Sequence, residues 1–151
     1  MTAPLSSELT TTLLEAARAA ARNAYIPYSH FPVGAAILTA DGTVVAGCNV
    51  EIASFGLTVC AERNAVFGAV ASGHRQVKAV AVSAPLAPGT TPCGACRQVL
   101  NEFKPADSDL VVILDEEAAP RYTTLNALLP DAFGPVDIDR AEEERRRSGE
   151  H

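Results

Sequence analysis

The chain has 151 residues, enough for one domain with its own hydrophobic core, and 48% of them are hydrophobic while 20% are charged. A formal net charge of −6 disfavours a nucleic-acid partner, because such partners are bound mainly by Lys and Arg that neutralise phosphates. The first ten residues lack a basic segment followed by an apolar one, and no apolar run approaches ~18 residues, so we expect a cytoplasmic protein without a membrane partner.

The first half of the chain is predicted to form a helix, a hairpin and a second helix. Apolar residues recur at helical spacing over residues 6–23, in an Ala-rich background. Residues 33–51 contain two β-prone runs separated by Asp41-Gly42, which are suited to a hairpin turn. A second helical pattern follows over residues 60–72.

The second half of the chain alternates between apolar strands and helices. Residues 77–85 and 109–116 are short apolar runs of the kind found inside a sheet that is covered on both faces. Residues 93–103 between them are expected to be helical, and a short helix is expected around Thr124–Leu129. This order predicts an α/β fold, with a mixed sheet and helices on both sides.

No internal repeat or linker divides the chain. We therefore expect a single domain over residues 1–139. Residues 140–151 are dominated by Glu and Arg, and this charged tail is predicted to be either helical or disordered.

The four cysteines are Cys48, Cys60, Cys93 and Cys96. Without a secretory signal a reducing compartment is favoured, where such spacing more often serves metal or redox chemistry than disulfides. Cys60 and the Cys93–Cys96 pair fall where helices should begin, and a helix N-terminus stabilises a thiolate. Three such thiolates could occupy three corners of a zinc tetrahedron and leave the fourth corner for water.

Other interpretations of the cysteines stay open at this point. They are two disulfides, a closed structural zinc site with Cys48 as fourth ligand, and a redox pair of Cys93 and Cys96 that leaves Cys60 unexplained. Glu62 favours the open zinc site, because in the first helical turn both Cys60 and Glu62 can reach a pocket beyond the helix end. An ordinary glutamate at a helix N-terminus is the alternative.

Several segments together carry a family resemblance. Cys60-Ala61-Glu62 and Pro92-Cys93-Gly94-Ala95-Cys96 resemble the signature of zinc-dependent cytidine and deoxycytidylate deaminases. "PYSHFPVGAA", "GCNVE", "TVCAERNAVF", "PCGACRQVL" and "LLPDAF" are similar to small cytidine deaminases with three cysteine ligands. The resemblance runs from about Leu13 to Phe133. It implies a three-layer α/β/α fold with a mixed five-stranded sheet, one Zn²⁺ per chain and a homotetramer.

The resemblance also assigns the chemistry to particular residues. It implies that Cys60, Cys93 and Cys96 hold the zinc and that water takes the fourth position. Glu62 would move protons from water to the pyrimidine ring and to the departing ammonia. Arg63 would donate to sulfur and offset the negative charge of three thiolates, the alternative being a solvent-facing arginine.

Substrate contacts follow from the same resemblance. Phe31 would stack on the base, Asn49 and Glu51 would bind the ribose hydroxyls, and Ala61 would contact the substrate. Phe133 would reach the active site of a neighbouring subunit. Core packing is the alternative for both phenylalanines, and turn or surface roles are the alternatives for Asn49 and Glu51.

The implied function is hydrolytic deamination of cytidine and 2′-deoxycytidine, a reaction of pyrimidine salvage. A carboxylate at Glu51 would repel a 5′-phosphate and so favours a nucleoside over a nucleotide. The alternatives are a deaminase of a related aminopyrimidine nucleoside such as blasticidin S, and a non-catalytic zinc protein in which Cys48 completes the coordination. Ile52 stands where the family pattern has Asn, which leaves substrate breadth and subunit contacts open.

Overall fold

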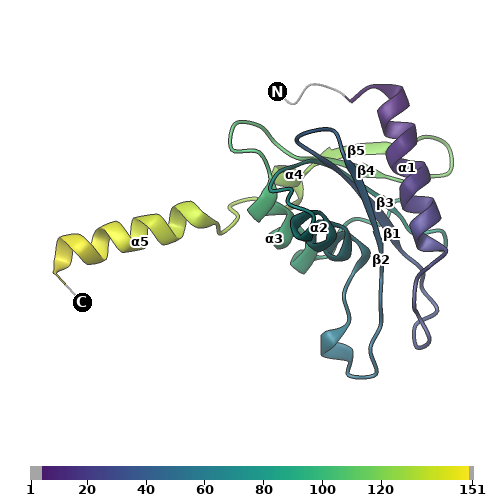
Figure 1. Ribbon diagram of the computed structural model, residues 1–151, viewed down its shortest axis with the longest axis horizontal. Helices are drawn as coiled ribbons and strands as arrows, with labels where there is room; N and C mark the ends of the chain where they lie inside the picture. The colour runs from purple at the N-terminus through teal and green to yellow at the C-terminus, as the bar shows by residue number, and fades with distance from the viewer. Residues whose placement is uncertain (1–4, 150–151) are drawn as a thin grey trace.

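A computed structural model of the chain describes residues 5–149 (Figure 1). Five strands form one sheet in the order β2-β1-β3-β4-β5, in which only β3 and β4 pair in parallel. The strands are β1 (Gly34–Thr39), β2 (Val44–Cys48), β3 (Val77–Ser83), β4 (Val111–Leu114) and β5 (Arg121–Thr124). The helices are α1 (Ser7–Ala21), α2 (Ala61–Ala71), α3 (Gly94–Phe103), α4 (Leu125–Leu128) and α5 (Pro135–Ser148), and a 3-10 turn η1 (Phe55–Leu57) precedes α2.

The sheet is the middle of three layers. Helix α1 covers one face, and α2 and α3 cover the other (Figure 1). On the α1 side, Leu13 and Ala17 pack with Ile113 of β4 in one buried cluster. On the opposite side, Val66 of α2 and Leu100 of α3 belong to a second buried cluster with residues from β1, β3 and β4. The predicted α/β/α architecture with a mixed sheet is therefore confirmed.

Two glycines set the distance between the helices and the sheet. A Cβ added to Gly34 of β1 would lie 1.9 Å from the carbonyl oxygen of Ala17, and one added to Gly47 of β2 would lie 2.5 Å from the amide nitrogen of Ala65. Both neighbours are helix backbone, which has no flexible end to move aside. Glycine therefore allows α1 and α2 to approach the sheet closely from its two faces.

Most of the expected elements lie where the pattern placed them. The Asp41-Gly42 hairpin is present, with Gly42 at φ +90°, and β3, α3 and β4 fall within or close to the predicted ranges. The element-by-element prediction from the sequence did not include β5. The segment "RYTT" is a short edge strand with exposed positions, so it contains no apolar run. The short helix begins just after it, at Leu125.

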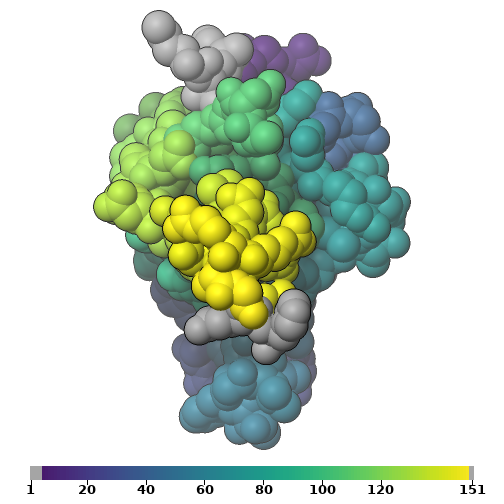
Figure 2. Space-filling model, turned by 90° about the vertical axis from the view of Figure 1, so that its left-hand side faces the viewer, coloured from purple at the N-terminus to yellow at the C-terminus, as the bar shows by residue number. Residues whose placement is uncertain are grey.

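Helix α5 leaves the body of the domain (Figure 1). None of its described side chains is buried, and residues 140–149 are all exposed. In the view of Figure 2 the helix (yellow) stands in front of the domain. The predicted charged tail is helical as far as Ser148, in a helix that begins at Pro135. Within residues 5–149 no helix combines the length and the apolar character needed to cross a bilayer.

Candidate metal centre

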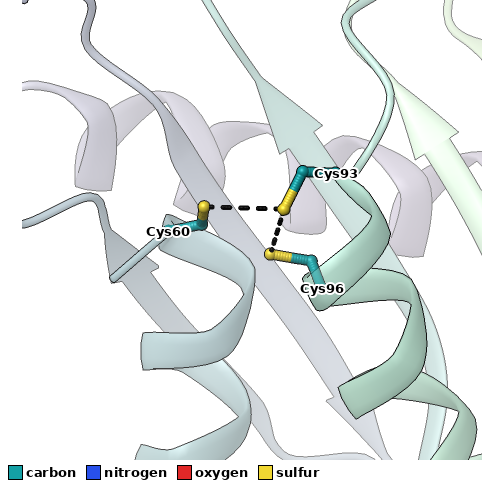
Figure 3. A group of neighbouring side chains, drawn as sticks. All are labelled: Cys60, Cys93 and Cys96. Carbon is teal, nitrogen blue, oxygen red and sulfur yellow. Dashed lines mark hydrogen bonds between the residues drawn. The ribbon is translucent and has the colours of Figure 1, made fainter. Parts of the chain in front are cut away.

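The three sulfur atoms come from the N-terminal ends of α2 and α3. Cys60 and Cys93 are the N-cap residues of these helices, with extended backbone (φ −69°, ψ 158° and φ −67°, ψ 166°), and neither side chain caps its own helix. Cys96 lies in the first turn of α3. Their sulfur atoms point toward one another beyond the helix ends (Figure 3). The cluster therefore lies where helix N-termini favour negative charge.

The spacing of these sulfur atoms fits a zinc ion. All three Sγ atoms lie within 4.8 Å of one another, with 3.8 Å between Cys60 and Cys93 and 3.4 Å between Cys93 and Cys96. Sulfur ligands ~2.3 Å from zinc at tetrahedral corners are about 3.8 Å apart. The donor set, three cysteine sulfurs, is also one that zinc prefers. Three corners of a tetrahedral site are thus supplied by this chain.

Cys48 does not belong to the cluster. Its Sγ donates to the backbone carbonyl of Asn23 at 3.5 Å, and the cluster of metal-ligating atoms found among residues 5–149 omits it. All four cysteines are free thiols. The structure therefore favours neither a closed four-cysteine site nor a pair of disulfides.

Charge within the cluster is unequally shared. The pKa of Cys60 is lowered to about 5, chiefly by a hydrogen bond from the Cys96 thiol and then by Arg63, whose Nη2 donates to Cys60 Sγ at 3.5 Å. The pKa of Cys96 is raised by its hydrogen bond with Cys60, by burial and by the nearby negative charges of Glu62 and Cys60. Arg63 Nε is buried without a hydrogen-bond partner in the described part of the chain. Arg63 thus provides the positive charge that favours the thiolate form of Cys60.

Glu62 is a buried carboxyl group beside this thiolate. Only 4% of its surface is exposed, although it lies in the first turn of α2. Burial raises its pKa, and the negative charge of Cys60 adds to that shift, while bonds from its own backbone N–H and from the Cys96 thiol oppose it. The side chain therefore takes up a proton more readily than an exposed glutamate would.

Glu51 and Asn49 both hold the loop before β1. Residue Glu51 is 7% exposed, and its carboxylate accepts from the backbone N–H of Tyr28 at 3.0 Å and of Ser29 at 3.1 Å, and from the Ser29 hydroxyl. These bonds, with the hydroxyl first, lower its pKa. Asn49 accepts from the Val33 N–H and donates to the Phe31 carbonyl, both at 2.9 Å. The structure thereby brings the loop of Phe31 to the end of β2.

The two remaining predicted contact residues differ in exposure. Ala61 is fully buried in the core beneath the first turn of α2. Phe133 is 61% exposed in the single chain, and its carbonyl accepts from Gln98 and Asn101 of α3 at 2.9 and 3.1 Å. The Phe133 segment is therefore fixed to the helix that carries two of the cysteines.

Two residues of the site were not predicted from the sequence. Arg97 donates to the carbonyls of Pro92 and Leu128, both at 2.7 Å, and to the Thr91 hydroxyl at 3.0 Å, so it holds the loop that leads into Cys93. Ser29 bonds to Glu51, as described above. Both lie inside segments that carried the family resemblance, which was the only available signal.

A cavity of about 510 Å³ lies elsewhere, between α3, α4 and the start of α5. Its lining includes Asn101, Lys104 and Val136 but no residue of the sulfur cluster or of the Phe31 loop. The arrangement of ligand atoms, and not the size of a cavity, therefore locates the chemistry in this chain.

Comparison with known proteins identifies relatives over most of the chain. The family model for the cytidine and deoxycytidylate deaminase zinc-binding region matches residues 7–113, a span that includes all three clustered cysteines. A cytidine deaminase of Halalkalibacterium halodurans is 46% identical over 127 residues, covering 84% of this chain and 96% of that protein. One of Mycobacterium tuberculosis is 46% identical over 121 residues, covering 80% and 86%. The crystal structure of cytidine deaminase from Burkholderia pseudomallei has a TM-score of 0.76 and 47% identity, covering 85% of this chain and all of that one.

Proposed function

The chain belongs to the cytidine and deoxycytidylate deaminase family, and we propose that it hydrolyses cytidine and 2′-deoxycytidine to uridine and 2′-deoxyuridine with release of ammonia. The observation that carries this proposal is a cluster of three free cysteine sulfurs beside the buried carboxyl group of Glu62. A pyrimidine-salvage reaction of this kind consumes one water molecule for each ammonia released.

Cys60, Cys93 and Cys96 would hold one Zn²⁺ per chain. When bound, zinc acts as a Lewis acid that brings the pKa of water down to about 7, so that a nucleophile is available at neutral pH. Three thiolates weaken a Lewis acid by their negative charge. Arg63 and the two helix N-termini oppose this effect, because they draw electron density from the sulfur atoms.

Glu62 would carry the proton. A carboxylate oxygen of Glu62 accepts a proton from water and delivers it to N3 of the pyrimidine as oxygen adds to C4. The second proton then goes to the amino group, which leaves as ammonia. Burial raises the pKa of Glu62. The group can therefore hold a proton between the two transfers, a role that typically contributes ~10²–10⁴-fold to the rate.

The Phe31 loop and the end of β2 would hold the nucleoside. Phe31 would stack on the base, and Asn49 and Glu51 would bind the ribose hydroxyls. Glu51 Oε1 accepts one hydrogen bond from the described part of the chain, which leaves a lone pair for a hydroxyl donor. Ala61 would contact the substrate from its position between Cys60 and Glu62.

A homotetramer would cover an apolar surface next to this pocket. Phe55 and Leu57 are 71% and 66% exposed, and the ring of Tyr28 lies edge-on against Phe55 with 5.6 Å between centroids. Burial of such side chains against a second copy is favourable at roughly 25 cal/mol per Å². Phe133 would then reach the active site of a neighbour. The tetramer and the cytoplasmic location stay predictions.

Two substitutions test the proposed chemistry. Glu62→Ala should keep one zinc per chain, measured by metal analysis, and lose about 10²-fold or more of the cytidine-deaminating activity. Cys48→Ala should keep both zinc and activity. A Glu62→Ala protein with ordinary turnover, or a Cys48→Ala protein that has lost its metal, would contradict the proposal. A zinc-loaded wild type that acts on blasticidin S but not on cytidine would favour a deaminase of a related nucleoside. A zinc-loaded wild type that acts on neither compound would favour a non-catalytic zinc protein.

A further inference from the structure

We propose that Ser29 is a positioning residue for nucleoside recognition: its hydroxyl fixes the Glu51 carboxylate relative to the Phe31 backbone. This inference rests on the proposed function, since it concerns how the ribose and the base are held together. Ser29 itself would touch neither the substrate nor the sulfur cluster.

The two carboxylate oxygens of Glu51 accept different numbers of hydrogen bonds. Oε2 accepts from two backbone amides, those of Tyr28 and Ser29, at 3.0 and 3.1 Å. Within residues 5–149, Oε1 accepts only from the Ser29 hydroxyl. A carboxylate oxygen has two lone pairs in its plane, so Oε2 is saturated while Oε1 retains one. The free lone pair of Oε1 is therefore the acceptor that a ribose hydroxyl would use, and the Ser29 hydroxyl sets its direction.

The oxygen of the same Ser29 hydroxyl also accepts a hydrogen bond from the backbone. Ser29 Oγ accepts from the backbone N–H of Phe31 at 3.1 Å. His30, between the two residues, has φ +56°, which a residue with a side chain rarely adopts. The Ser29 hydroxyl closes this turn across His30 and so helps to hold a backbone conformation that costs free energy by itself.

Together these contacts make one hydroxyl a direct link between the Glu51 carboxylate and the Phe31 backbone, beside the link that Asn49 provides. Glu51 follows β2, whereas Phe31 lies in the loop before β1, and the direct side-chain bond between Ser29 and Glu51 spans 22 residues of sequence. With alanine at position 29 the carboxylate would keep its two backbone donors and stay in place. However, the hydrogen bond that fixes the direction of Oε1 would be lost, and among the described residues the Phe31 backbone would be held by Asn49 alone.

Steady-state kinetics on Ser29→Ala tests the inference. For cytidine we expect KM to rise about tenfold with kcat within twofold of the wild type, because uniform binding is lost and the transition state is not selectively affected. For 2′,3′-dideoxycytidine, which lacks the 2′- and 3′-hydroxyls of the ribose, we expect KM to rise less than threefold. Calorimetry with uridine, the product, should show the same tenfold loss of affinity without turnover.

Matched variants separate the hydroxyl from the shape of the side chain. Ser29→Thr keeps the hydroxyl and should stay within twofold of the wild type, whereas Ser29→Val has nearly the same shape and should behave as Ser29→Ala. Ser72→Ala, an exposed serine at the far end of α2, is the control for a serine substitution as such. The Thr and Val pair also decides the question if Ser29→Ala folds poorly.

The proposal is wrong if Ser29→Ala and Ser29→Val leave KM unchanged, or if they impair cytidine and 2′,3′-dideoxycytidine equally. It is also wrong if Ser29→Thr loses as much as Ser29→Val. These results presuppose a wild type that deaminates cytidine. An inactive, zinc-loaded wild type would instead refute the proposed function, so the two failures are distinguishable.

Discussion

Cys60 and Cys96 hold their protons with very different strength although their sulfur atoms belong to one cluster. The pKa of Cys60 is lowered to about 5, so this thiol is ionised at neutral pH. The pKa of Cys96 is raised, so this thiol keeps its proton. A metal ligand must be a thiolate, and therefore zinc has to displace the proton of Cys96 but not one from Cys60.

This difference predicts how zinc binding depends on pH. Around neutral pH, zinc uptake should release at least one proton, and the apparent affinity should rise about tenfold per pH unit for each proton released. Arg63→Ala removes a donor to Cys60 and so raises the pKa of that thiol. The affinity should then fall more steeply with decreasing pH, starting above the wild-type pKa of about 5.

Chelator competition at several pH values measures this effect. Arg22→Ala, at an exposed arginine that ends α1, serves as the control and should leave the pH profile unchanged. A zinc affinity that does not vary with pH, or an Arg63→Ala profile identical to that of the wild type, would contradict the assigned protonation of the cluster.

At the scale of single elements, helix α2 is placed by its contact with β2. Gly47 faces backbone atoms of α2, and a Cβ there would lie 2.5 Å from Ala65 N and 2.7 Å from Ala61 O. Ala61 is flanked by Cys60 and Glu62. A shift of this helix away from the sheet would therefore move Cys60 and Glu62 together.

Gly47→Ala should accordingly affect both stability and the metal centre. We expect the free energy of unfolding to fall by about 1–3 kcal/mol because the core is overpacked, and the zinc to be lost more rapidly to a chelator. Gly68→Ala in the same helix is the matched control, since its Cβ would meet only Val45 Cγ1 at 3.6 Å. That variant should be neutral or more stable by up to about 1 kcal/mol, as expected for a better helix former. Urea denaturation and zinc release report both effects, and equal behaviour of the two variants would count against the close-contact explanation.

Elements whose apolar residues recur at a regular spacing could be predicted from the sequence, and elements without such a spacing could not. Helix α1 repeats its buried positions Leu13, Leu14 and Ala17 at helical spacing, so it could be placed from sequence alone. Strand β5 has no comparable pattern, because an edge strand with exposed side chains is stabilised by pairing with β4 and not by its own residues. Its position depends on tertiary structure.

The same distinction applies to the candidate site. Spacing along the chain indicated Cys60, Glu62, Cys93 and Cys96, because each helix N-terminus brings its own residues together locally. The bonds of Ser29 and Arg97 could not be predicted, since they join positions 22 and 31 residues apart through the folded sheet. The roles given to Phe31, Asn49, Glu51, Ala61, Phe133 and Arg63 stay predictions until variants are measured.

At the scale of the whole molecule, the charged C-terminal helix projects from the three-layer domain, and within residues 5–149 only its start lies against α3 and α4. Helix α5 buries no described side chain, and its ion pairs, such as Arg140 with Asp137 and Arg146 with Glu142, are internal to the helix. Exposed pairs of this kind contribute little to stability, about 0–1 kcal/mol each. The domain therefore gains little from the last part of the chain.

Removal of residues 140–151 tests this separation. We expect the free energy of unfolding of the shortened chain to lie within about 0.5 kcal/mol of that of the full chain, because residues 140–149 are all exposed. Its zinc content and cytidine turnover should also be unchanged. Urea denaturation, metal analysis and light scattering on both chains provide the measurements. A shortened chain that changes its oligomeric state or loses activity would mean that α5 contributes to the assembled enzyme.

The sulfur donors lie on two helices that are separated in the sequence by the central strand. Cys60 precedes α2, β3 follows that helix, and the Cys93–Cys96 pair arrives only after β3. During translation a nascent chain thus has a single donor until Cys93 and Cys96 leave the ribosome, by which point the strand that joins the two halves of the sheet has been synthesised. Metal capture by the growing polypeptide is consequently a late event, and a fragment released before residue 96 lacks the full donor set.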